Sequence, residues 1–369
     1  MASVGIVLLF FLAPQVLHGG LSLFIERVLA GLDRGAVYAT LAVALMLVFS
    51  SASFVNLAQG QLAMIGAFIA YVLAVPREDG LAGGRAMSLD GAIGSIVGWD
   101  GFTVGPLRAG LIGAILVAMV FSAGLGLAVE RLLRPFGPGD DLPPTLVTLG
   151  LFVICGSFTT WLWGHGPRPF PNLFPDGPDD HLRLGGAEVP WDTIGAFVVL
   201  GIVAVVVHRL LDEGSLTRPR AWALAAALGT LAATLIAPEL FVTPELMLTA
   251  LAFALAAAVT GGFGSLRRIA AAGVGAGVIE AVVVGYLADI DSAFSVLSLA
   301  VAFGIIVMVL WLRGPATATE PSPTTGDTPT TGGTPTSTPP TSTPPTSTAS
   351  TASATPRAGA APAERGATA

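Results

Sequence analysis

The sequence contains no lysine, because all 17 of its basic residues are arginine. A nucleotide-binding P-loop needs a lysine to reach the phosphates, so this chain cannot use one to hydrolyse ATP. The same absence excludes a lysine that forms a Schiff base with a carbonyl substrate. These two classes of enzyme are therefore excluded before any motif is considered.

Charge of either sign is also scarce. Only 11% of the residues are charged and 53% are hydrophobic, whereas about a quarter of a soluble domain is charged. Apolar runs long enough to cross a bilayer, about 20 residues each, recur along the chain. The single cysteine, Cys155, lies inside such a run and can form no disulfide framework. The predicted fold class is an all-α, polytopic membrane protein.

The apolar runs predict about ten transmembrane segments, or about eight if the first and third do not cross. The first run, residues 4–17, has neither a basic n-region nor an A-x-A cleavage site, so we expect a helix there rather than a signal peptide. The other expected spans lie near residues 35–52, 58–75, 109–130, 145–163, 194–211, 221–237, 246–263, 270–288 and 296–312.

Arginine placement predicts the orientation. If the spans alternate, the arginines at 131, 134, 209, 218, 220, 267, 268 and 313 all fall on one side. The short loops on the other side hold acids and no arginine, and positive charge marks the cytoplasmic side. Both termini are then expected in the cytoplasm of a cell-membrane protein, and the longer segments 76–108 and 164–193 face outward.

The composition changes at Gly314. Residues 314–369 are a Thr/Ser/Pro-rich repeat with no apolar side chain larger than alanine. Such a segment buries too little surface to offset its ordering entropy. We therefore expect a transmembrane domain over 1–313 and a disordered tail over 314–369. A solvated extension is favoured over a glycosylated stalk, which would need an external C-terminus.

Three amides interrupt the apolar background in NLAQGQLAMIGAF, residues 56–68: Asn56, Gln59 and Gln61. They could line a cavity at a break in a membrane helix, where polar groups are tolerated. They could instead hydrogen-bond neighbouring helices, at about 1 kcal/mol each. The spacing alone slightly favours the second interpretation.

Glycines and one carboxylate stand out in TGGFGSLRRIAAAGVGAGVIEAVVVGYL, residues 260–287. A tight turn is predicted at Gly261, Gly262 and Gly264, and close approach of another helix at Gly273 and Gly277. Arg267 and Arg268 mark the cytoplasmic side of the turn. Glu280 follows within the same span; an intramembrane carboxylate is a functional candidate, although a buried structural partner fits equally well.

Glu130, Arg131 and Arg134 lie in VERLLRPF, where Pro135 ends a helix. We interpret them as a cap and a cytoplasmic anchor. The four histidines are scattered without ligand-like spacing, and there is no G-x-S-x-G motif. The sequence thus predicts no catalytic residues, no metal site, no cofactor and no nucleic-acid binding.

Taken together, these segments resemble the permease subunits of ABC importers for branched-chain amino acids. The stretch from GLDRGAVYAT to NLAQGQLAMIGAFIAYVL is similar to the N-terminal signature of that family. VERLLRPF resembles its cytoplasmic I-E-R-x-x-x-R-P element, GHGPRPFPNLF lies where it has an outer loop, and TGGFGSLRRIAAAGVGAGVIE resembles its G-G-x-G-S…G-x-x-x-G…E region. The resemblance covers about residues 24–313.

The resemblance implies that Asn56, Gln59, Gly60 and Gln61 lie in a broken-helix region near the translocation path. Glu280 is carried over as a carboxylate that is either beside this path or structural. The implied partners are a second permease subunit, separate ABC ATPase subunits and an external substrate-binding protein. Leucine, isoleucine and valine are the implied substrates, although related permeases handle urea, short amides and other amino acids.

One departure from the family leaves alternatives open. The cytoplasmic loop in RLLDEGSLTRPRAWALAAALG is shorter than expected, and the helix that docks into the ATPase is missing from it. A degenerate paralogue without energy coupling, acting as a passive channel or membrane partner, is therefore an alternative to the importer. An ion-coupled secondary transporter that uses Glu280 is a third possibility, with less support because the sequence shows no convincing internal repeat.

Overall fold

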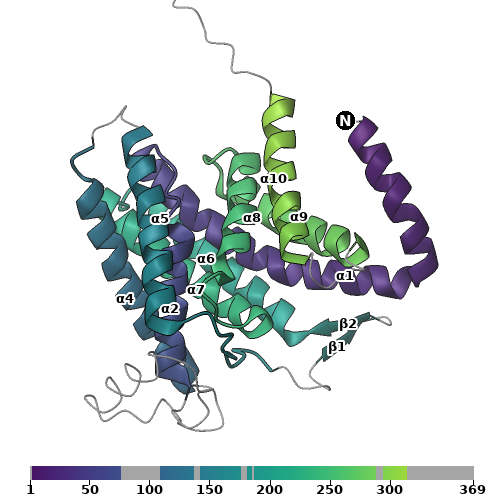
Figure 1. The fold of residues 1–369 in the computed structure, drawn as a ribbon, viewed down its shortest axis with the longest axis horizontal. Helices are drawn as coiled ribbons and strands as arrows, with labels where there is room; N and C mark the ends of the chain where they lie inside the picture. The colour runs from purple at the N-terminus through teal and green to yellow at the C-terminus, as the bar shows by residue number, and fades with distance from the viewer. Residues whose placement is uncertain are drawn as a thin grey trace, which may run out of the picture. The chain divides into compact units, whose positions relative to one another are not determined.

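The computed structural model describes residues 2–75, 109–136, 142–175, 181–184, 187–287 and 294–313. The predicted tail and the outward segment 76–108 lie outside these ranges. Within them the chain forms helices and one small hairpin (Figure 1): α1 (Ala2–Ala52), α2 (Gln59–Ala74), α4 (Ala109–Leu133), α5 (Leu142–Trp163), β1 (His181–Leu184), β2 (Ala187–Pro190), α6 (Trp191–Asp212), α7 (Arg218–Leu240), α8 (Leu246–Gly261), α9 (Leu266–Leu287) and α10 (Phe294–Arg313).

The hairpin is a small departure from the all-α expectation. Strands β1 and β2 pair antiparallel, with His181 opposite Pro190 and Leu184 opposite Ala187. It lies within the segment 164–193, which the sequence predicts to be a loop. Helix α6 begins directly after β2, so the hairpin leads the chain into that helix.

The two separate helices predicted at 4–17 and 35–52 are one continuous helix, α1. Its apolar part that could cross a membrane runs from Phe24 to Ala52 and contains Asp33 and Arg34. The predicted second span began at residue 35, directly after these two charges. Arg34 is paired with Glu239 of α7, a partner that the local sequence cannot show.

The count of ten separate spans is not confirmed. Six of the described helices are long and apolar enough to cross a membrane: residues 24–52 of α1, residues 110–133 of α4, α5, α6, α7 and residues 266–285 of α9. Helices α2, α8 and residues 298–311 of α10 are apolar but shorter. At 1.5 Å per residue, α2 is about 24 Å long, less than the roughly 30 Å of the hydrocarbon core.

Helix α1 is central to the packing and contacts α9, α7, α8 and α6 (Figure 1). Small residues bring α1 and α9 together: a Cβ on Gly277 would lie 2.3 Å from the backbone nitrogen of Gly35, and a Cβ on Gly273 would lie 2.5 Å from Cα of Ala39. Helix α7 packs against α1, α2 and α4. The buried core is therefore built from helix surfaces that are rich in alanine and glycine.

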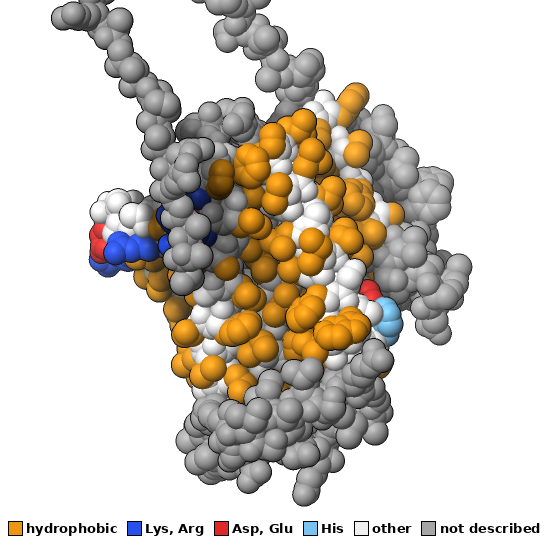
Figure 2. Space-filling view, turned by 60° about the vertical axis from the view of Figure 1, so that its left-hand side comes forward, with side chains coloured by type: hydrophobic (Ala, Val, Ile, Leu, Met, Phe, Trp, Pro, Cys, Tyr) orange, Lys and Arg blue, Asp and Glu red, His pale blue; other side chains and the backbone are white. Residues whose placement is uncertain are grey.

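Helices α4 and α5 expose a broad apolar face (Figure 2). Val120 of α4 is 74% exposed, and Ile154 of α5 is 65% exposed. Water would not be a stable environment for a face of this kind, whereas lipid or another membrane chain would be. The exposed apolar face agrees with the membrane class predicted from composition.

Candidate functional site

A polar break separates α1 from α2 at residues 53–58. Ser53 has φ +63°, a left-handed conformation that is uncommon for a residue other than glycine, and it turns the chain out of α1. The side-chain oxygen of Asn56 then accepts a hydrogen bond from the backbone N–H of Ala58 at 3.1 Å. This local bond closes the turn that leads into α2 at Gln59.

Asn56 and Gln59 are both 1% exposed and bonded inside the bundle. Asn56 Nδ2 donates to Gln59 Oε1 at 3.2 Å, and Gln59 Nε2 donates to the backbone oxygen of Ala225 in α7 at 2.7 Å. The next N–H of the break, that of Leu57, donates to Thr148 Oγ1 of α5 at 3.2 Å. These bonds hold the break between α5 and α7.

Gly60 lets α2 approach α8. A Cβ at this position would lie 3.1 Å from Cβ of Leu251 and 3.2 Å from the backbone oxygen of Met247. Gly60 is itself buried. Its place in the structure is a helix contact directly after the break.

Gln61 differs from the other two amides. It is 6% exposed, and its Oε1 atom has no hydrogen-bond partner among the described residues. It lines a cavity of about 510 Å³ that lies against α5 and the start of α8, which we call the Gln61 groove; its lining is Gln61, Phe152, Gly156, Ser157, Thr160, Trp161, Pro244, Glu245 and Leu248. The break thus places one unsatisfied amide beside an open space.

Glu280 of α9 lies in a different set of contacts. It is 2% exposed and accepts hydrogen bonds from the hydroxyl of Tyr38 in α1, at 2.5 Å, and from the hydroxyl of Ser298 in α10. The ring of Tyr38 stacks on Phe253 of α8 with centroids 5.0 Å apart. Glu280 is not among the residues that line the Gln61 groove, so the structure does not bring the two predicted features into one site.

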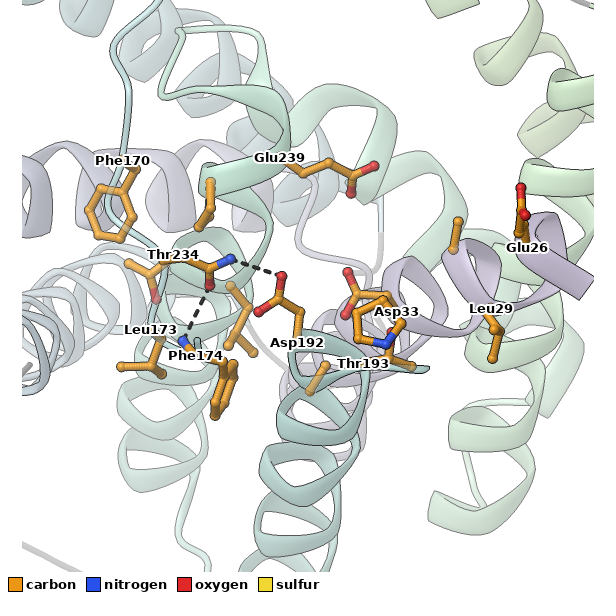
Figure 3. Close-up of a pocket in the computed structure, with 16 residues that line it drawn as sticks. Glu26, Leu29, Asp33, Phe170, Leu173, Phe174, Asp192, Thr193, Thr234 and Glu239 are labelled. Carbon is orange, nitrogen blue, oxygen red and sulfur yellow. Dashed lines mark hydrogen bonds between the residues drawn. The ribbon is translucent and has the colours of Figure 1, made fainter. Parts of the chain in front are cut away.

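A second cavity, of about 490 Å³, lies between α1, α6, α7 and the segment 170–174 (Figure 3). Figure 3 shows Asp33 and Asp192 projecting into the same space, and Asn172 Nδ2 donates to Asp192 Oδ2 at 2.9 Å. Glu239 of the same lining is paired with Arg34. Sequence reasoning missed this cavity because its carboxylates come from helices far apart in the chain.

The glycines of the α8–α9 segment occupy a tight reversal. Gly262 has φ +79° and caps α8, and its N–H donates to the backbone oxygen of Ala258 at 2.9 Å. A Cβ on Gly261 would lie 2.4 Å from Ile269 Cγ1, so the two helices meet closely there. Gly264 follows within the turn, and Arg267 and Arg268 are in the first turn of α9.

The predicted anchor residues join α4 to α7. Glu130 is 2% exposed and accepts from Arg134 Nη2 at 2.9 Å, and this hydrogen bond raises the pKa of Arg134 above its ordinary value. Arg218 of α7 lies 3.7 Å from the same carboxylate and donates to the backbone oxygen of Leu133 at 3.2 Å. Arg131 lies in the last turn of α4.

These contacts define two ends of the helix bundle. One end holds the α4–α7 junction, the short link 213–217 between α6 and α7, and the α8–α9 turn, where the ring of Phe263 lies 4.3 Å from that of Phe49. At the other end, Arg168 pairs with Val242 through the backbone, and His165 lies 3.3 Å from Glu245.

The described residues contain no group of three or more His, Cys, Asp or Glu side chains arranged to hold a metal ion. What the break and the first turn of α2 do contain is a set of amides, Asn56, Gln59 and Gln61, in a largely apolar membrane bundle. Polar groups at a helix interruption can face a path for a polar solute, which lipid-facing helices cannot provide.

A comparison with known protein families assigns the chain to one of them. The family described as the branched-chain amino acid transport system / permease component matches residues 27–218. The chain belongs to this family. The matched region includes the break, the Gln61 groove residues of α5 and the anchor residues of α4. The chain is accordingly a multi-pass transport subunit of the cell membrane rather than a catalytic subunit.

Two relatives illustrate the range of similarity within the family. The high-affinity branched-chain amino acid transport system permease protein BraD of Pseudomonas aeruginosa is 24% identical over 328 residues, which cover 81% of this chain and 95% of BraD. The corresponding LivH protein of Escherichia coli K12 is 23% identical over 152 residues, 41% of this chain and 42% of LivH. No solved structure matches the chain.

Proposed function

We propose that this chain is a transmembrane subunit of an ABC importer and forms part of the translocation path for branched-chain or related amino acids. The observation that carries the proposal is the polar break at 53–58, which leads into Gln61 and its groove. The family supports the transport role, and the names of BraD and LivH suggest the substrate class.

The importer has further subunits in this proposal. Separate ATPase subunits energise transport, an external binding protein delivers the substrate, and a second permease completes the path. The chain supplies the membrane helices, and alternating access comes from rocking of helix groups around the path. The absence of lysine agrees with an ATPase on a different chain.

The orientation is part of the proposal. The end of the bundle with the α4–α7 junction and the α8–α9 turn carries the arginine cluster, Arg131, Arg134, Arg218, Arg220, Arg267 and Arg268. The opposite end carries Asp33, Asp192, Glu239 and Glu245, together with Arg34 and Arg168. Because positive charge marks the cytoplasmic side, the arginine end faces the ATPase.

The short link between α6 and α7 favours an alternative. Helix α6 ends at Asp212 and α7 begins at Arg218, so residues 213–217 alone connect them. Coupling requires a contact that differs between two states of the transporter. A link this short offers few atoms for such a contact, as expected for an uncoupled paralogue that works as a passive channel or membrane partner.

Purification from the native membrane in mild detergent, followed by mass spectrometry, tests the proposal. An ABC importer predicts that an ATPase and a second permease accompany the chain. Leucine uptake by membrane vesicles should then require ATP and survive a protonophore. Recovery of the chain alone, with uptake independent of ATP, would support the uncoupled paralogue. Uptake that collapses with the protonophore and survives ATP depletion would support an ion-coupled transporter.

A further inference from the structure

An inference about the Gln61 groove rests on the proposed function and specifies which end of the ligand the groove recognises. We propose that this groove recognises the ammonium group and the aliphatic side chain of the transported amino acid and does not bind its carboxylate. The substrate class is thus an alkylammonium compound, of which branched-chain amino acids are one kind.

The unpartnered polar atom beside the groove is a hydrogen-bond acceptor. Gln61 is 6% exposed, and its Oε1 atom has no partner among the described residues. A buried polar atom without a partner is costly, so a ligand that donates a hydrogen bond to it gains affinity. An ammonium group supplies such a donor, whereas a carboxylate does not.

Gly156 of α5 lies directly beside this amide. A Cβ on Gly156 would lie 3.4 Å from Gln61 Oε1 and 3.5 Å from its Nε2. A side chain at this position would therefore pack against the amide and limit the room in which it can turn toward a ligand. The groove volume of about 510 Å³ is in the range of small-molecule pockets.

The charge of the groove also favours the ammonium end of the ligand. Glu245 at its rim contributes a carboxylate, and none of the described lining residues is positively charged. The acid favours a cationic ligand group, and no lining side chain offers a charged partner for an anion. The hydroxyls of Ser157 and Thr160 can hydrogen-bond either the ammonium or the carboxylate group of a ligand.

The remaining lining suits an aliphatic side chain. Phe152, Trp161 and Leu248 provide apolar surface beside the polar groups. Burial of a leucine-sized side chain against such surface stabilises binding. An amine with this side chain and no carboxylate should therefore occupy the groove, and the corresponding acid without an amine should not.

Protection of a single cysteine tests this without requiring transport. Cys155 is the sole cysteine of the sequence, so Cys155→Ser with Ser157→Cys leaves one thiol, on the groove lining. The full chain in its native membrane is treated with a water-soluble maleimide in the presence of leucine, isoamylamine or isocaproate. Leucine and isoamylamine should slow the labelling of position 157, and isocaproate should not.

Variants identify the acceptor. Gln61→Leu in the cysteine background should raise the concentration of isoamylamine needed for half-protection by about tenfold or more, as expected for the loss of one such hydrogen bond. Gly156→Ala should weaken protection in the same direction. Gly150→Ala is the matched control on α5, since a Cβ there meets nothing within 4 Å, and it should leave protection unchanged.

The possible outcomes separate this inference from the proposed function. Protection by isocaproate equal to that by isoamylamine, no labelling of position 157 at all, or unchanged protection in Gln61→Leu would each overturn the inference. If leucine uptake is ATP-dependent but no ligand protects the thiol, the importer stands and the groove is not its binding site. If isoamylamine protects and no ATP-dependent uptake occurs, the groove stands and the proposed importer does not.

Discussion

At the scale of single residues, Gln59 and Gln61 have different surroundings although they are two positions apart on α2. Gln59 completes a buried chain of hydrogen bonds from Asn56 to Ala225 of α7. Gln61 presents an unpartnered oxygen to a groove. A helix turns about 100° per residue, so neighbouring amides face different parts of the bundle. The first amide is suited to holding the break in place and the second to meeting a ligand.

Substitution of these two amides should affect stability differently. Gln59→Leu leaves the Asn56 amide without its acceptor in a buried site, so we expect the free energy of unfolding to fall by about 1–3 kcal/mol. Gln61→Leu removes an already unpartnered oxygen and should leave stability unchanged or raise it. Thermal unfolding of the purified chain in detergent measures both. Equal loss in the two variants would contradict the distinction.

Glu280 is a second residue whose surroundings decide its role. Tyr38 and Ser298 donate to it, so the carboxylate links α1, α9 and α10. Among the two interpretations that the sequence left open, these contacts favour the structural one. The sequence indicated an unusual carboxylate but not its donors, which come from other helices.

Two variants of Glu280 separate a structural role from ion transport. Glu280→Gln keeps an oxygen acceptor for one hydroxyl and presents an NH2 donor to the other, whose oxygen can accept from it, so leucine uptake should persist at a level close to that of the unchanged chain. Glu280→Leu leaves both hydroxyls without an acceptor and should lower the free energy of unfolding by about 1–3 kcal/mol. Uptake in vesicles and thermal unfolding provide the measurements. Complete loss of uptake in a stably folded Glu280→Gln protein would instead indicate a transported ion.

At the scale of elements, the contact of α1 with α9 depends on small residues from both helices. The spacing of Gly273 and Gly277 predicted a closely approaching helix, but the partner could not be read from the same segment. The structure supplies it: Gly31 and Gly35 of α1 face the backbone of α9. Close approach of this kind gains dispersion contacts that larger side chains would prevent.

A matched pair of substitutions on α9 tests this contact. Gly277→Ala places a Cβ 2.3 Å from the backbone nitrogen of Gly35, so the helices must separate, and we expect a loss of about 1–3 kcal/mol in the free energy of unfolding. Gly275→Ala meets nothing within 4 Å and should cause no such loss. Thermal unfolding of both proteins is the measurement. Similar stability of the two would show that this helix contact is not tightly packed.

At the scale of the whole molecule, the distribution of charge along the bundle decides how the transporter can work. The six clustered arginines lie at one end and Asp33, Asp192, Glu239 and Glu245 lie at the other, with apolar helices between them. The Gln61 groove includes Pro244 and Glu245 from the second end. If that end is external, the groove lies toward the side from which substrate arrives.

Cysteine labelling tests this orientation. In a Cys155→Ser background, Glu213→Cys places a thiol on the link between α6 and α7, and Gly166→Cys places one at the opposite end; both positions are exposed. A membrane-impermeant maleimide added to intact cells should label position 166 and not position 213. After the membrane is opened, both should react. The reverse pattern in intact cells would contradict the proposed orientation.

The sequence by itself determined the membrane class, the family resemblance and the positions of the unusual polar residues. Composition and short motifs are local properties, so they can be read without a fold. Only the tertiary structure decided which of these residues have partners. Gln59 meets Ala225, Glu280 meets Tyr38 and Ser298, and Gln61 meets a groove formed with α5 and α8. Those partners are distant along the chain, and helix packing alone brings them into contact.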